Sequence, residues 1–245
     1  MRNFDRVAGI YDSTRGLPPF VMAVVVGSIA DELRDSGTIL DAGVGTGRFA
    51  GPLKKKGLDV VGLDVSKAML SEAKKKSLAN LVMGELTTMP FANEAFDSCL
   101  MVHVLHLVEN PMRLLSEIAR VCRSRVLSVA EVSDRESIRE DYIRLRSEMG
   151  YKVSETSEHR LTTLVAPAKL KDVITYPLET RADDDIIYLR DRISSVTWDV
   201  PDKVHEGIIN RLISTVGGKV YKSNKTIKLA TWDVDSIRSV DLSRW

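Results

Sequence analysis

The stretch Ile39-Leu40-Asp41-Ala42-Gly43-Val44-Gly45-Thr46-Gly47 carries the strongest structural signal in this chain. It predicts a strand over 38–42 that ends in an acid and turns through three alternating glycines into a helix over 45–56. Each glycine lacks a Cβ, so the backbone can turn tightly and a ligand can approach the main chain. The helix begins with unpaired N–H groups that point at such a ligand. The stretch therefore predicts a ligand site at a strand–turn–helix junction.

The spacing of these glycines separates two kinds of nucleotide site. A nicotinamide dinucleotide turn has the pattern G-x-G-x-x-G. This chain has G-x-G-x-G, with Asp41 two residues before the first glycine and Arg48 after the last. A second apolar run, Val60-Val61-Gly62-Leu63-Asp64, predicts a strand over 59–63 with an acid at its end. A carboxylate there can accept both ribose hydroxyls, a feature shared with dinucleotide sites.

Two later stretches complete the pattern. The first is Gly84-Glu85-Leu86-Thr87-Thr88-Met89-Pro90-Phe91, and the second runs from Phe96-Asp97 to His106. The glycine turn, the acids and the Phe-Asp strand together resemble the class I S-adenosylmethionine (SAM) methyltransferases, in particular the ubiquinone/menaquinone type. The resemblance covers roughly residues 38–132. It implies SAM as the cofactor, S-adenosylhomocysteine (SAH) as the product and methyl transfer as the reaction.

The resemblance also implies which residues contact the cofactor. Asp41 and the backbone of Gly43, Val44 and Gly45 would hold the amino-acid end of SAM. The other implied contacts are Asp64 with the ribose, Glu85 and the Leu86 N–H with the adenine, Val65 and Met69 with the adenine faces, and Met101 and His103 at the end of the fourth strand. Simpler alternatives stay open: Asp41 and Asp64 can cap their own turns, Glu85 can be a solvated loop acid, and Val65 and Met69 can be core residues.

His103 and His106 form the one pair of candidate catalytic groups near the expected site. Because a histidine can accept a proton near neutral pH, His103 could act as the base for a hydroxyl nucleophile. The alternative is that His103 packs on SAM and that His106 supports its loop. The three-residue spacing could also suit a metal, but no third ligand is evident, so we expect no metal site.

Two segments outside the central pattern also resemble the family. Residues 4–15, from Phe4 to Arg15, are similar to its N-terminal Tyr-Asp segment. This similarity makes Tyr11 a lid residue over SAM and Arg15 a contact for an anionic substrate or the SAM carboxylate, the alternative being a surface segment held by Tyr11. The segment 192–202 resembles an S-x-T-W-x-L-P element of the family. Its Trp198 either lines the substrate pocket or lies in the core. His159 and His205 lie in polar contexts, and we expect both to be exposed.

The composition limits the class of protein. The chain has 245 residues, of which 44% are hydrophobic and 28% charged, and a net charge of +1. That charge makes a nucleic acid an improbable partner. The two cysteines lack metal-ligand spacing and indicate a reducing compartment. The most apolar stretch, Phe20 to Ala30, is shorter than the roughly 20 residues of a spanning helix. We therefore expect a soluble, cytoplasmic protein without a signal peptide that acts on a small molecule, in an oligomeric state that the sequence leaves open.

Strands that alternate with helices predict an α/β fold. We expect a doubly wound, Rossmann-like, seven-strand and mainly parallel sheet with an antiparallel last strand and a helical C-terminal insertion. Strands are expected near 81–84, 97–102, 125–131, 172–180 and 225–233, and helices near 18–35, 111–121, 134–149, 182–195 and 201–216. A further helix is expected after Ser66, with Met69, Leu70 and Ala73 on its inner face. The chain divides into an N-terminal lid and helix (1–37), a SAM-binding core (38–132) and a C-terminal part (133–245) whose insertion covers the substrate pocket, all within one domain.

The sequence thus predicts a SAM-dependent methyltransferase that acts on a small molecule at oxygen, carbon or nitrogen. One alternative is an RNA or protein methyltransferase, which would need a basic surface such as Lys54-Lys55-Lys56 or Lys74-Lys75-Lys76. Those runs are more simply solvated helix ends. Another alternative is a non-catalytic SAM-binding regulatory protein. Because a fold does not determine a substrate, the sequence leaves the acceptor and the pathway open.

Overall fold

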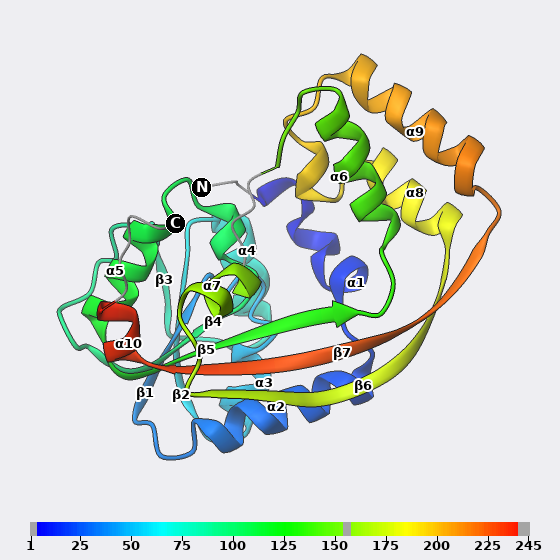
Figure 1. Ribbon diagram of the computed structural model, residues 1–245. Coiled ribbons are helices and arrows are strands. Elements are labelled where there is room, and N and C mark those ends of the chain that lie inside the picture. Colours follow the sequence, from blue (N-terminus) through cyan, green and yellow to red (C-terminus); the bar gives the residue numbers. More distant parts are fainter. Residues whose placement is uncertain (1–3, 154–157, 240–245) are drawn as a thin grey trace. The chain divides into compact units, whose positions relative to one another are not determined.

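A computed structural model describes residues 4–153 and 158–239 of the chain (Figure 1). Its centre is a seven-stranded sheet in the order β3-β2-β1-β4-β5-β7-β6. The strands are β1 (Thr38–Ala42), β2 (Asp59–Asp64), β3 (Leu81–Met83), β4 (Phe96–Met101), β5 (Cys122–Ser133), β6 (Lys169–Arg181) and β7 (Val220–Asp233). The first five strands pair in parallel, and β7 runs antiparallel. The predicted fold class is confirmed.

Strand β1 lies at the point where the order of the sheet reverses, because it pairs with β2 on one side and with β4 on the other. In an open α/β sheet, ligands bind outside the carboxyl ends of the strands at such a switch point. In the register of the sheet, Ala42 is paired with both Leu63 and Met101, so the three strands end side by side. The loops after β1, β2 and β4 therefore meet at one edge.

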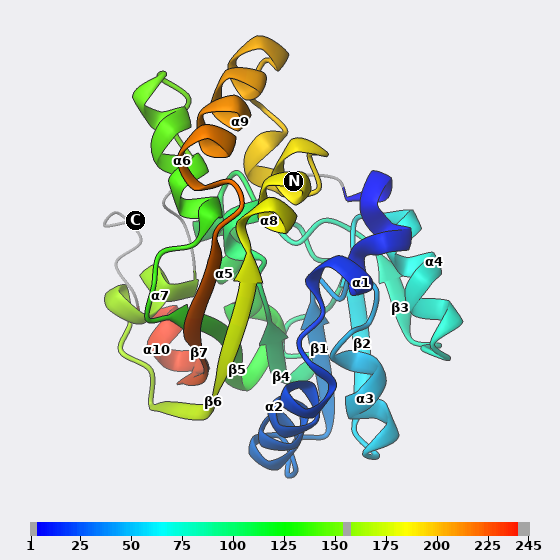
Figure 2. The ribbon, with the colours of Figure 1, turned by 90° about the vertical axis from the view of Figure 1, so that its right-hand side faces the viewer.

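Helices cover both faces of the sheet (Figure 2). On one face lie α2 (Pro19–Glu32) and α3 (Ala50–Lys55), which pack against each other, and on the other lie α5 (Pro111–Val121) and α10 (Val234–Arg238). Residues of α5, α7 (Glu158–Leu164) and α10 share one buried cluster with the inward residues of β1, β4, β5 and β7, including the fully buried Trp232. The remaining elements are η1 (Asp5–Ile10), α1 (Tyr11–Arg15), α4 (Lys67–Lys75), η2 (Leu105–Leu107), α6 (Ile138–Glu148), α8 (Ala182–Arg190), η3 (Ser195–Thr197) and α9 (Asp202–Val216).

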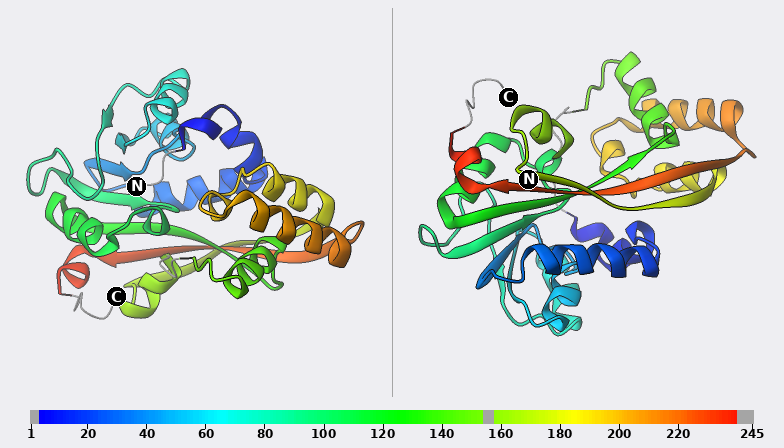
Figure 3. Two further views of the ribbon diagram at one scale, coloured as in Figure 1. Left: turned by 90° about the horizontal axis from the view of Figure 1, so that it is seen from above. Right: turned by 60° about the horizontal axis from the view of Figure 1, so that its bottom comes forward.

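The chain forms two compact units. The first comprises Met1–Glu131, Thr156–Ile174 and Ile227–Trp245, and the second comprises Val132–Glu155 and Thr175–Thr226. In the second unit, helices α6, α8 and α9 lie side by side and enclose their own apolar core (Figure 3). The expected helical insertion is therefore present, while the three-part division of the chain and the covering of a substrate pocket stay predictions.

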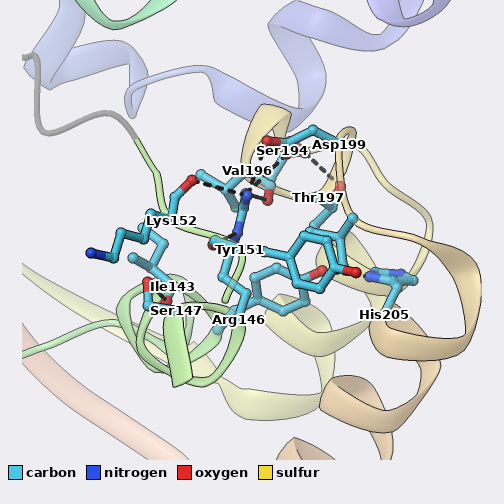
Figure 4. Close-up of polar contacts among 12 residues, drawn as sticks. Ile143, Arg146, Ser147, Tyr151, Lys152, Ser194, Val196, Thr197, Asp199 and His205 are labelled. Atoms are coloured by element: carbon cyan, nitrogen blue, oxygen red, sulfur yellow. Dashed lines mark hydrogen bonds and ion pairs between the residues drawn. The ribbon is translucent and has the colours of Figure 1, made fainter. Parts of the chain in front are cut away.

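A buried polar network lies beside this second core (Figure 4). The guanidinium of Arg146, which is 1% exposed, donates to both carboxylate oxygens of Asp199 at 3.0 Å and to the carbonyl oxygens of Val196, Tyr151 and Lys152. All five of its N–H groups are thereby bonded. The network holds the segment around η3, which has little regular structure of its own.

Two local expectations need correction. Helix α3 begins at Ala50 rather than Gly45, because the glycine turn extends to Phe49. His205 is only 5% exposed, since it lies on the inner face of α9 and its Nδ1 accepts a hydrogen bond from the Tyr142 hydroxyl at 2.7 Å. The side chain of His159 lies outside the described residues.

Within the described part of the chain, no single helix has the length and apolar character needed to cross a membrane. The pair Asp5–Arg15 and Pro19–Glu32 meets the test together but is bent by 102°. Buried core helices meet the same test, and α2 buries Val21, Val25 and Ile29.

Candidate functional site

A cleft opens at the carboxyl ends of β1, β2 and β4, all within the first unit. Its empty space is about 440 Å³ with open solvent included. The cleft is lined by Phe4, Tyr11, Gly43, Gly45, Asp64, Ser66, Met69, Val102, His103, Val104 and Leu107. Apolar and aromatic side chains thus surround a few polar groups, which is the usual composition of a small-molecule binding site.

The glycine turn forms one wall of the cleft. Gly43 and Gly45 have φ angles of +82° and +53°, a region that residues with a Cβ rarely adopt. A Cβ at Gly43 would also lie 2.6 Å from Cγ2 of Val104, which follows β4. The glycines are therefore required both for the turn and for the close packing of the loops after β1 and β4.

Asp64 ties the loops of β1 and β2 together. Its Oδ2 accepts the backbone N–H of Gly45 at 2.9 Å, and its Oδ1 accepts that of Ser66 at 2.8 Å. Burial raises the pKa of this carboxyl above its ordinary value, although the Ser66 and Gly45 N–H groups act against the shift. The Asp64 carboxylate therefore caps its own turn, as the simpler alternative expected, and it also lines the cleft.

Asp41 lies behind the glycine turn at the end of β1. It is 4% exposed, and burial, with a smaller effect of the neighbouring Asp64 charge, raises its pKa to about 7. The charge of Arg48 and the backbone N–H of Ala50, the first residue of α3, act against this shift. Asp41 is therefore buried behind the turn and does not line the cleft. A cationic ligand at the turn would favour the ionised form of both acids.

The N-terminal segment closes one side of the cleft with Phe4 and Tyr11. Asp5 accepts a hydrogen bond from the Ser66 hydroxyl, which is itself the N-cap of α4. Asp12 accepts from the Thr46 hydroxyl at 2.6 Å and forms an ion pair with Lys76. These two acids fix the segment to the loops after β1 and β2.

Arg15 stacks on the rings that border this side of the cleft. Its guanidinium carbon lies 5.7 Å from the ring centre of Tyr11 and 6.0 Å from that of Phe4. The Arg48 guanidinium donates to the backbone oxygen of Arg15 and so fixes the end of α1. The arrangement keeps a cation beside the cleft, although Arg15 does not belong to its lining.

His103 is the second residue after β4, which ends at Met101. The side chain is exposed and lines the cleft, and its φ angle of +56° is uncommon for a residue with a Cβ. His106 lies in η2, is half-buried and is absent from the lining. Within residues 4–153 and 158–239, no group of three or more His, Cys, Asp or Glu side chains is arranged to hold a metal ion.

The structure brings together about half of the residues that the sequence selected. Those that line the cleft are Tyr11, Gly43, Gly45, Asp64, Met69 and His103. The others lie elsewhere in this structure: Leu86 and Met101 are in the core, Val44 packs near Gly62, Val65 is half-buried, and Glu85 is an exposed loop acid. Their cofactor contacts stay predictions.

Five lining residues were not selected from the sequence as site residues, namely Phe4, Ser66, Val102, Val104 and Leu107. Ser66 was recognised only as a helix cap, a role that it also has here. Val102 and Val104 could have been found from their place after β4, since parallel strands bring their carboxyl ends to one edge. Phe4 carries no such signal, because tertiary contacts alone place its segment.

The comparisons with known proteins agree with this geometry. The family model described as "Methyltransferase domain" matches residues 40–129. The demethylmenaquinone methyltransferase of Renibacterium salmoninarum is 32% identical over 140 residues, which cover 53% of this chain and 57% of that protein. The malonyl-[acyl-carrier protein] O-methyltransferase of Serratia marcescens is 30% identical over 121 residues, which cover 49% of this chain and 47% of that protein.

The similarity extends further in structure than in sequence. The YcgJ protein of Bacillus subtilis has a TM-score of 0.56 at 18% identity and covers 87% of this chain and 98% of that one, which shows a shared fold. The chain spans between 24% and 64% of the length of the curated relatives that it matches. Residues 40–129 thus match a methyltransferase domain, and the sheet of the chain has the 3-2-1-4-5-7-6 order typical of the methyltransferase fold.

Proposed function

We propose that this protein transfers a methyl group from SAM to a small-molecule acceptor. The observation that carries the proposal is the meeting of the glycine turn and Asp64 in one cleft at the switch point of the sheet. A sulfonium cofactor supplies an electrophilic methyl group and leaves as a neutral thioether. The protein mainly has to bind that cofactor, align the nucleophile and exclude water.

The residues of the cleft fit a cationic nucleoside. Gly43 and Gly45 expose backbone to the cleft, and Asp64 offers carboxylate oxygens to hydroxyl donors. Burial raises the pKa values of Asp41 and Asp64, and a positively charged ligand beside the turn would favour the ionised form of both acids. The rings of Phe4 and Tyr11 add faces that attract a cation.

The binding step is tested by isothermal titration of the whole protein with SAM, with SAH and with NAD. We expect micromolar affinity for SAM and SAH and no binding of NAD. Asp64→Asn should weaken SAM binding at least tenfold, whereas Asp59→Asn should not. Asp59 is the matched control because it lies exposed at the opposite end of the same strand. Absence of SAM binding to the folded protein would refute the proposal.

The transfer step is tested with methyl-labelled SAM and a fractionated metabolite extract. Label that moves to a small molecule supports the proposal. Label that moves only to RNA or only to protein would overturn the proposed class of acceptor. If the acceptor is RNA, the protein should also bind RNA in a salt-sensitive way. SAM binding without transfer to any fraction would leave a SAM-binding protein without catalysis.

A further inference from the structure

The lysines of this chain are unevenly distributed. Between residues 50 and 77 the chain has seven lysines and three acids, of which Asp64 is buried, whereas the net charge of the whole chain is +1. Two runs of three lysines, 54–56 and 74–76, make up most of this excess. The first run lies at the end of α3 and the second at the end of α4, both within the first unit. The proposed function gives these residues no role.

The fold brings the two runs to one place. The ammonium group of Lys54 donates to the backbone oxygen of Ser77, the residue after the second run, at 3.4 Å. Gly47, which lies three residues before α3, is packed so closely on Leu78 that a Cβ there would not fit. The carboxyl-terminal ends of α3 and α4 are therefore neighbours, and their six lysines form one surface, the lysine patch.

Few acids neutralise the lysine patch. Lys75 forms an ion pair with Glu72, and Lys76 forms one with Asp12. Apart from Lys54, the other lysines of the patch are exposed and have no acidic partner among the described residues of the chain, and they are Lys55, Lys56 and Lys74. Their ammonium groups are available to a partner from outside the chain.

Helix stability alone does not account for six lysines in one patch. A cation near the carboxyl end of a helix is favourable because that end carries a partial negative charge, but the effect is confined to the last turn and is screened by salt. Ammonium groups gathered on one surface also repel one another. One or two lysines at each helix end would serve the helices better, so the patch points to an anionic partner.

The composition of the surface distinguishes between anionic partners. Residues 50–83 contain no arginine and no aromatic residue. Protein–protein interfaces are enriched in arginine and aromatic residues and depleted in lysine. Proteins that recognise single-stranded nucleic acid stack its bases on aromatic or arginine side chains. Lysine is a compact, strongly hydrated point charge, which suits a diffuse anionic surface such as that of a lipid bilayer.

We propose that the lysine patch holds this protein on the surface of a bilayer that contains anionic lipids. The attraction acts between the ammonium groups and the charged lipid headgroups, so it requires neither insertion into the bilayer nor a cofactor. The cleft lies at the other end of the same helices, because the glycine turn precedes α3 and Ser66, which lines the cleft, caps the start of α4. The cleft therefore stays accessible to a small molecule in solution while the patch contacts lipid.

Sedimentation with lipid vesicles tests the proposal on the whole protein. Vesicles of phosphatidylcholine with about 30% phosphatidylglycerol should bind the protein at about 50 mM salt and release it at about 500 mM, because salt screens the attraction. Pure phosphatidylcholine vesicles should not bind it. The triple variant Lys55→Gln, Lys56→Gln and Lys74→Gln should bind the anionic vesicles about 100-fold more weakly, from roughly fivefold for each lysine removed.

The matched control lowers the net charge equally at exposed lysines outside the patch, with Lys171→Gln, Lys203→Gln and Lys222→Gln. It should bind the anionic vesicles within about threefold of the native protein, and circular dichroism shows whether both triple variants are folded. Equal weakening in the two variants would mean that net charge alone acts and would overturn the proposal.

Two further outcomes would also overturn the proposal. One is that neither kind of vesicle binds the native protein. The other is that an oligouridylate or an RNA duplex binds while the vesicles do not, with binding lost in the variant of Lys55, Lys56 and Lys74, which would assign the patch to RNA. Because no SAM is present in these measurements, their outcome is independent of the proposed function.

Discussion

The carboxylate of Asp64 accepts the backbone N–H of Gly45 at 2.9 Å, so the end of β2 is bonded directly to the glycine turn after β1. The second carboxylate oxygen accepts the N–H of Ser66 at 2.8 Å. One side chain thus fixes the two loops between which a nucleoside would bind. Because the proposed function also gives Asp64 a contact with the cofactor, both stability and binding have to be measured for a variant of Asp64.

We expect Asp64→Ala to lower the free energy of unfolding by about 1–3 kcal/mol, because it leaves the N–H groups of Gly45 and Ser66 without their acceptor. Urea unfolding at pH 7.5 measures this change. The control is Asp31→Ala, which removes an exposed ion pair with Arg34 and should change the free energy by less than about 0.5 kcal/mol. Equal stability of both variants would mean that the loops find other partners.

A second prediction concerns pH and Asp41, whose pKa rises to about 7 in the folded protein. The folded state then binds the proton of this acid more tightly than the unfolded state. The free energy of unfolding should therefore fall as the pH rises from about 4 to about 7. Asp41→Asn should be more stable than the native protein at pH 8, by up to about 4 kcal/mol, and the gain should vanish near pH 4.

The measurement is urea unfolding of both proteins at several pH values between 4 and 8, where the difference between them isolates Asp41. Asparagine has nearly the size and shape of aspartate but does not titrate, so the variant removes the proton equilibrium with little change in packing. A difference that does not change with pH would show that Asp41 does not titrate in this range.

The N-terminal segment supplies a third prediction. Asp12 accepts a half-buried hydrogen bond from the Thr46 hydroxyl of the glycine turn and forms an exposed ion pair with Lys76. Asp12→Ala should detach the segment and speed trypsin cleavage at Arg15, with less than about 1 kcal/mol lost in global stability. Limited proteolysis followed by mass spectrometry measures the cleavage rate, and the rate should fall again when SAM is added. An unchanged rate would mean that buried Phe4 holds the segment alone.

The sheet and the glycine turn could be predicted because local patterns encode them. The strand expected over 38–42 is β1 (Thr38–Ala42), since a buried parallel strand is a short apolar run that ends at its turn residues. The N-terminal segment could not be predicted in this way. Asp5 and Asp12 hold it through partners more than 30 positions away, Ser66 and Thr46, and such contacts leave no periodic pattern.

His205 shows a different cause of error. Its neighbours in sequence are polar, but counting along α9 places it on one face with Ile208, Ile209 and Leu212. That helical periodicity could have indicated burial. The partner of its Nδ1, the hydroxyl of Tyr142, lies 63 positions away and could not be found from the sequence.

A fourth prediction follows from this pair. Burial lowers the pKa of His205 below its ordinary value, so the unfolded chain binds the proton more tightly than the folded one. Stability should be lost as the pH falls below about 6.5. Hydrogen exchange, corrected for the intrinsic rate, should show α9 losing protection between pH 7 and pH 5. His205→Asn should abolish that dependence, and Tyr142→Phe should lower protection at every pH because it leaves Nδ1 without a donor.

The last prediction concerns Arg146 and Asp199 in the second unit (Figure 4). The ion pair itself contributes little, because the Asp199 side chain is 47% exposed. The larger contribution comes from the carbonyl oxygens that Arg146 satisfies, which belong to Val196, Tyr151 and Lys152. Asp199→Asn should therefore cost less than about 1 kcal/mol, whereas Arg146→Ala should cost more than about 3 kcal/mol.

Hydrogen exchange over residues 191–200 separates these contributions. Arg146→Ala should remove protection there while β1 and β2 stay protected, because the second unit has a core of its own. Arg146→Lys should be intermediate, since an ammonium offers three donors without the planar fork that reaches five acceptors. If Arg146→Ala and Asp199→Asn lose equal protection, the ion pair and not the carbonyl contacts would be what holds the segment around η3.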